Sequence, residues 1–141
     1  MENPAAKALL RELKETEDLA GCLQRNEARF CHQTVAEGLT NLYKTRSISK
    51  AELARRSEVS LVYLHQVFAG RRMPSRDRLL GLCVGLRTTL DEAQLLLRLA
   101  VYAPLCPCNR RDAILIYGIF HQHTLADLRE ELVKFGEAPF Y

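Results

Sequence analysis

Apolar residues recur at helical spacing along most of the chain, and this pattern predicts an all-α protein. Leucines set among charged residues indicate an amphipathic helix over residues 4–20, which Gly21 ends or kinks. Another helical pattern runs from Glu27 to Lys44. Near the end of the chain, Pro104 and Pro107 break the pattern. After them we expect a helical hairpin, formed by one helix over residues 110–120 and another over residues 125–135.

The stretch between Ser49 and Leu86 contains three short helices that begin at hydroxyl caps. Ser49 followed by Glu52 is a capping-box signature. After a tight turn, Ser60 begins a second helix over residues 60–68, which Gly70 stops, and Ser75 caps a third. A helix, a tight turn and a second helix in this order form a helix-turn-helix, which presents its second helix to the major groove of DNA.

The motifs of this stretch resemble the lambda-repressor-like family of helix-turn-helix proteins, also called the Xre/Cro type. They are Leu53-Ala54, Ser57-Glu58-Val59-Ser60, Gly70, Arg71-Arg72-Met73-Pro74 and Leu79-Leu80. The blocks VFAGRRMPSRDRLLGL, LDEAQLLLRLA, NRRDAILIYGIF and FGEAPF resemble a bacterial subgroup with a C-terminal helical hairpin. The resemblance implies a repressor-like five-helix domain at residues 27–103, preceded by an extra N-terminal helix (1–26) and followed by a two-helix extension (104–141).

The resemblance also implies a set of DNA contacts, and it makes residues 60–68 the recognition helix. Lys50, at the start of the preceding helix, would contact a phosphate, as would arginines beyond the recognition helix. The implied nucleic-acid-binding residues are Lys50, Ser60, Leu61, Val62, Tyr63, Gln66, Arg71, Arg72 and Arg76. The expected function is sequence-specific binding of double-stranded DNA by a transcriptional regulator.

The recognition helix departs from the family pattern because its exposed positions are unusually apolar. Leu61 and Val62 stand where phage repressors usually carry polar residues, and they can touch a thymine methyl but cannot hydrogen-bond a base. Only Gln66, together with Tyr63 and His65, can read a hydrogen-bond pattern. An exposed apolar patch is typical of protein contacts. The alternative function is therefore a protein–protein adaptor that docks through Leu61, Val62 and Tyr63.

Charge is distributed unevenly along the chain, whose net charge is +3. Residues 44–87 hold ten basic residues and three acidic ones, so this segment carries +7 and the remainder −4. A basic module between acidic helices favours a local anionic partner such as nucleic acid, although a solvated charged surface gives the same pattern. Because a single domain of this size buries little DNA, we expect a homodimer. Its candidate surfaces are residues 95–102 and the C-terminal hairpin.

Other chemistry finds little support in the sequence. Cys106, Cys108, His121 and His123 suggest a zinc site, but the histidines are two apart and point to different sides of a helix, so we expect no metal. We find no motif of a catalytic or phosphate-cradling site, and expect neither an enzyme nor a cofactor. With no apolar run long enough to span a membrane and no signal-peptide core, we expect a cytoplasmic protein with reduced thiols.

Overall fold

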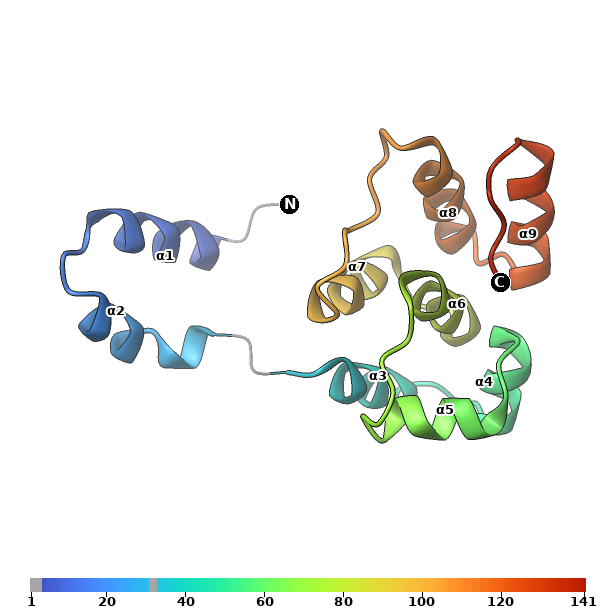
Figure 1. Cartoon of the computed structure of the whole chain (residues 1–141), viewed down its shortest axis with the longest axis horizontal. Helices are drawn as coiled ribbons and strands as arrows, with labels where there is room; N and C mark the ends of the chain where they lie inside the picture. Colours follow the sequence, from blue (N-terminus) through green and yellow to red (C-terminus); the bar gives the residue numbers. More distant parts are fainter. Residues whose placement is uncertain (1–3, 31–32) are drawn as a thin grey trace. The chain divides into compact units, whose positions relative to one another are not determined.

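The computed structural model describes residues 4–30 and 33–141, and these two segments form two compact units (Figure 1). The described residues contain helices and no β-strand, which confirms the all-α prediction. None of the helices in these segments is long and apolar enough to cross a membrane.

The N-terminal unit consists of α1 (Pro4–Glu15), α2 (Leu19–Arg25) and a 3₁₀ turn, η1 (Glu27–Arg29). The prediction of one helix over residues 4–20 was wrong, because Asp18 starts a new helix by accepting a hydrogen bond from the backbone N–H of Gly21. Gly21 therefore lies inside α2 and does not end a helix. A Cβ at Gly21 would lie 2.2 Å from Asp18 Oδ2, so glycine leaves room for this cap.

The larger unit contains seven helices among residues 33–141, and each begins at a hydroxyl or amide cap that accepts a backbone hydrogen bond. The predicted caps Ser49, Ser60 and Ser75 are confirmed. The helix expected to begin at Glu27 begins only at Val35, because Thr34 caps it there. The helices are α3 (Val35–Lys44), α4 (Lys50–Ser57), α5 (Leu61–Phe68), α6 (Arg76–Leu86), α7 (Leu90–Leu99), α8 (Arg110–Phe120) and α9 (Leu125–Lys134).

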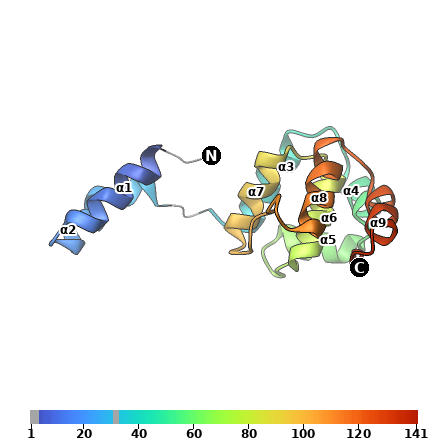
Figure 2. The ribbon, with the colours of Figure 1, turned by 90° about the horizontal axis from the view of Figure 1, so that it is seen from above.

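Helix α6 lies at the centre of this unit, with α7 and α9 on opposite sides of it (Figures 1 and 2). All of its residues from Leu79 to Leu86 are buried, so it is apolar on every side and not along one stripe only. Gly85 allows α4 to cross it closely, since a Cβ there would lie 2.3 Å from Ser57 Oγ. Burial of these leucines is the main favourable contribution to folding.

The C-terminal hairpin shares its hydrophobic core with the preceding helices. Leu115, Leu128 and Leu132 are fully buried and belong to the same cluster as the leucines of α4, α5 and α6. Gly118 brings α8 and α9 together, because a Cβ there would lie 2.0 Å from Leu128 Cδ2. The hairpin is therefore integral to the unit that contains α4 and α5.

Candidate nucleic-acid interface

The turn between α4 and α5 fixes the position of α5. Glu58 ends α4 in the left-handed conformation (φ 53°), and the next backbone N–H, that of Val59, donates to the carbonyl of Ala54. Ser60 then accepts a hydrogen bond from the N–H of Tyr63 at 3.0 Å and starts α5. Because Leu64 and Val67 are buried, the opposite side of α5 faces outward. The segment is a helix-turn-helix with a rigidly held second helix.

The outward side of α5 is mostly apolar at its N-terminal end. Leu61 is 42% exposed and Val62 is 68% exposed. Farther along the helix, His65 is exposed and Gln66 is half-buried. His65 and Gln66, which can hydrogen-bond a base edge, therefore come after Leu61 and Val62, which cannot.

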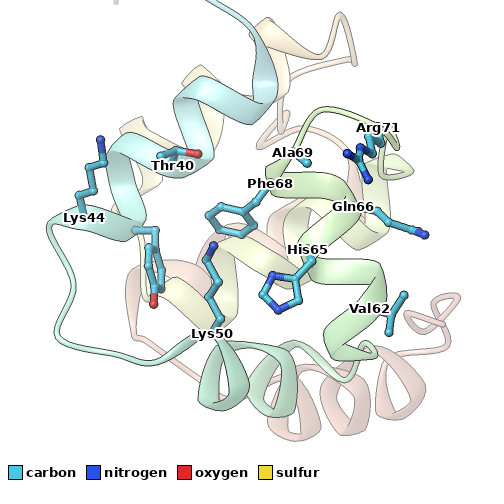
Figure 3. Close-up of a pocket in the computed structure, with 10 residues that line it drawn as sticks. Thr40, Lys44, Lys50, Val62, His65, Gln66, Phe68, Ala69 and Arg71 are labelled. Atoms are coloured by element: carbon cyan, nitrogen blue, oxygen red, sulfur yellow. The ribbon is translucent and has the colours of Figure 1, made fainter.

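A groove with a volume of about 810 Å³ lies between α3 and α5 (Figure 3). Lys50 reaches into it from the first turn of α4, and its Nζ lies 5.2 Å from the centre of the Phe68 ring and 5.8 Å from that of Tyr43. The two rings meet edge to face. This arrangement holds the ammonium group by cation–π attraction. The groove is lined by Thr40, Tyr43, Lys44, Lys50, Val62, His65, Gln66, Phe68, Ala69 and Arg71.

The charged residues of this groove are all cationic. Lys44 and Arg71 lie at opposite ends of it, with Lys50 between them (Figure 3). None of the three forms an ion pair with a described residue, and no carboxylate lines the groove. Lys44 was not among the predicted DNA contacts. Its position at the end of α3, within the basic segment 44–87, could have identified it as one. An anionic ligand here would meet no repulsion from a neighbouring acid.

Arg71 and Arg72 are exposed beyond α5, after Gly70 turns the chain at φ 75°. The guanidinium of Arg72 lies 5.1 Å from the centre of the Tyr63 ring, and that of Arg78 lies 5.3 Å from it. Tyr63 is half-buried between these two guanidinium groups. Partial burial raises the pKa of its phenol, so the hydroxyl stays protonated and can donate a hydrogen bond.

Arg76 does not belong to this group, although the sequence placed it there. Its guanidinium pairs with Asp112 at 3.1 Å and donates to the carbonyls of Ala103 and Pro104. These contacts tie α6 to α8 and to the loop before it. Because its donors already have internal partners, we do not include Arg76 in the proposed DNA contacts.

The residues that suggested zinc lie at the two ends of α8. Cys106 and Cys108 precede this helix, whereas His121 and His123 follow it. Its eleven residues span about 16 Å at 1.5 Å per residue, far more than the diameter of a zinc site. Among the described residues, no three His, Cys, Asp or Glu side chains come close enough to share a metal ion.

The geometry defines the class of protein: an all-α protein with a helix-turn-helix, the kind of module that binds DNA. The family model of the helix-turn-helix domain matches residues 8–96, well over half of the chain, so the chain belongs to this family. Comparison with curated proteins and with solved structures gave no match.

Proposed function

We propose that this protein binds double-stranded DNA sequence-specifically as a transcriptional regulator of the lambda-repressor-like, Xre type, with α5 in the major groove. The observation that carries the proposal is the exposed side of α5 beside the cations Lys50, Arg71 and Arg72, together with the absence of a carboxylate from the groove that Lys50 and Arg71 line. A major groove about 12 Å wide accepts one helix, and phosphates border it on both sides.

The proposed contacts divide into two kinds. Lys50, Arg71 and Arg72, with Lys44 added from the structure, would contact phosphates and supply most of the affinity. Gln66 and the protonated hydroxyl of Tyr63 would read hydrogen-bonding groups of the bases. The N-terminal end of α5 would also contact DNA through Ser60, Leu61 and Val62. The two aliphatic side chains there suit thymine methyl groups.

The proposed binding unit is a homodimer, because one domain covers a single half-site. Of the two candidate surfaces, residues 95–102 bury Leu96 and Leu97 in the core and expose only the aliphatic side chains of Leu95 and Val101 among their large hydrophobic residues. The hairpin instead exposes aromatic side chains, with Phe120 71% exposed and Tyr117 55% exposed. The hairpin is therefore the surface we propose for the dimer.

The exposure of Leu61 and Val62 supports a second candidate function, a protein–protein adaptor built on the same scaffold. Two exposed aliphatic residues beside the half-buried ring of Tyr63 would suit an apolar partner. The two functions differ in their response to salt, because phosphate contacts release counterions and apolar docking does not.

Selection from a pool of random duplex DNA, at low and at near-physiological salt, tests the proposed function. We expect enrichment of an inverted repeat whose half-sites lie about one helical turn apart. Weak binding that disappears with salt and enriches no sequence would contradict sequence-specific recognition. In that case, a protein partner that binds the original protein but not the Val62→Asp variant would establish the adaptor function.

A further inference from the structure

A second pocket lies on the other side of α4, where the C-terminal ends of α4 and α6 meet the N-terminal end of α9. Its volume is about 340 Å³. We infer that this pocket, called the arginine pocket below, binds a small phosphorylated ligand. It is lined by Arg55, Arg56, Glu58, Val84, Arg87, Gln122, His123, Thr124, Leu125, Ala126 and Arg129.

Positive charge exceeds negative charge in the arginine pocket. Arg55 and Arg56 share one carboxylate, that of Glu52, and Arg129 pairs with Glu58 at 2.6 Å. Arg87 has no ion-pair partner among the described residues. Four arginines and one carboxylate, that of Glu58, line the pocket, and Glu52 pairs with two of the arginines from outside the lining. With both carboxylates counted against the four arginines, an excess of two positive charges remains for an anion to neutralise.

The ends of α4 and α6 do not by themselves explain this cluster. Basic residues are favoured near a helix C-terminus, which accounts for Arg55, Arg56 and Arg87. Arg129, however, lies in α9 and comes from a different part of the chain, yet it faces the same space. Arginines at the C-terminal ends of α4 and α6 and in α9 therefore line one pocket.

Helix α9 also presents its N-terminal end to the pocket. Leu125 and Ala126 line the pocket, and their backbone N–H groups, the first two of α9, make no hydrogen bond within the described residues. Free N–H groups at a helix start attract phosphate, aided by the positive end of the helix dipole. These donors and the arginines are independent features, and both favour an anion at the same place.

The chemistry of the lining indicates the class of ligand. Guanidinium forks match the oxygens of phosphate, and the side chains of Val84, Leu125 and Ala126 offer an apolar wall for an organic portion. The volume lies at the lower end of the range for small-molecule pockets. These features fit a phosphorylated metabolite of modest size.

A ligand in the arginine pocket would compete for a contact that holds the helix-turn-helix. Glu58, the partner of Arg129, is the left-handed residue of the turn between α4 and α5. A phosphate that pairs with Arg129 would break the ion pair between Arg129 and Glu58, and the turn would lose this contact with α9. The pocket is thus placed to link ligand binding to the orientation of α5.

The test measures the binding of inorganic pyrophosphate, the probe, to the full chain in the absence of DNA. Isothermal titration calorimetry and ³¹P NMR follow this binding. We expect saturable binding of one pyrophosphate per chain. Each of the substitutions Arg87→Gln and Arg129→Gln should weaken it about tenfold or more, the loss expected for one charge-assisted hydrogen-bonding partner. Arg87 is exposed, so Arg87→Gln tests the site even if Arg129→Gln destabilises the fold.

The matched control is the double variant Arg71→Gln/Arg72→Gln, which removes two positive charges from the α5 side. It should bind pyrophosphate like the original protein. Equal weakening in the control, or no saturable binding at all, would overturn the proposal. Loss of DNA binding in Arg87→Gln to the same degree as in the control would also overturn it, because the pocket would then be a DNA phosphate contact. Since pyrophosphate binding is measured without DNA, its failure leaves the proposed DNA-binding function untouched.

Discussion

Tyr141, the last residue of the chain, donates a hydrogen bond from its hydroxyl to the backbone carbonyl of Ser57 at 2.7 Å. Ser57 is the last residue of α4, directly before the turn of the helix-turn-helix. The Tyr141 ring also lies 4.3 Å from the guanidinium of Arg78, which in turn contacts the Tyr63 ring. The end of the chain therefore supports both helices of the helix-turn-helix.

We predict that Tyr141→Phe lowers the free energy of unfolding by about 1 kcal/mol, because it removes one hydrogen bond and leaves the ring in place. Urea denaturation followed by circular dichroism measures this change. Tyr117→Phe is the matched control, since Tyr117 is exposed and its hydroxyl makes no hydrogen bond to a described residue. An equal effect of both substitutions would show that the Ser57 contact contributes nothing.

The same residue predicts a loss of stability at alkaline pH. Burial raises the pKa of Tyr141 from its ordinary value near 10 to about 12. Because the folded pKa lies above the unfolded one, the stabilisation is complete below pH 10 and is lost as the pH rises towards 12. Cys83 adds a loss that begins lower, near pH 9, since burial raises the pKa of its thiol from about 9 to about 12. Denaturation at several pH values should show a shallower loss in Tyr141→Phe, and an identical pH profile would contradict this assignment.

The sequence predicted the helices within residues 49–86 and 110–135 well because their start signals are local. Ser49, Ser60 and Ser75 cap helices through hydrogen bonds to residues three positions away, and such contacts can be read from spacing alone. Asp18 is an equally local cap, but leucines on both sides of it continue the apolar pattern. The pattern therefore predicted one helix where the structure has α1 and α2.

The side-chain partners of the basic residues could not be predicted because they depend on tertiary contacts. Arg76 pairs with Asp112, thirty-six positions away, so its place in the charge run gave the wrong environment. Lys50 lies near two aromatic rings from different helices. The arginine pocket likewise requires Arg129, which lies two whole helices, α7 and α8, farther along the chain than Arg87.

A pair of substitutions tests the close packing of the hairpin. Gly118→Ala places a methyl group 2.0 Å from Leu128 Cδ2, and overpacking of this kind costs about 1–3 kcal/mol. Leu128→Ala alone should cost about 2–5 kcal/mol, as a buried leucine usually does. In the double variant the new methyl group has room, so we expect the combined loss to be smaller than the sum of the single losses. Additive losses measured by urea denaturation would contradict the proposed contact.

The double variant Arg71→Gln/Arg72→Gln tests the phosphate contacts. We expect weaker binding to every duplex sequence, and a plot of log affinity against log salt that is less steep by about two units. Fluorescence anisotropy at several salt concentrations measures both quantities. Arg98→Gln is the control, because Arg98 is exposed on α7 and has no ion-pair partner among the described residues. Loss of affinity with an unchanged slope would exclude phosphate contacts by these two arginines.

The proposed dimer can be assigned to one of its two candidate surfaces by placing a charge on each. Phe120→Glu introduces a carboxylate among the exposed aromatic side chains of the hairpin, whereas Val101→Glu does so just after α7, where Val101 is 90% exposed. Burying an unpaired charge in an interface is costly, so we expect Phe120→Glu to shift the protein to monomers in sedimentation equilibrium and Val101→Glu to leave the dimer intact. Because a monomer covers one half-site only, Phe120→Glu should also lose the preference for an inverted repeat while keeping binding to a single half-site at low salt. The opposite pattern, with monomers only in Val101→Glu, would move the interface to residues 95–102.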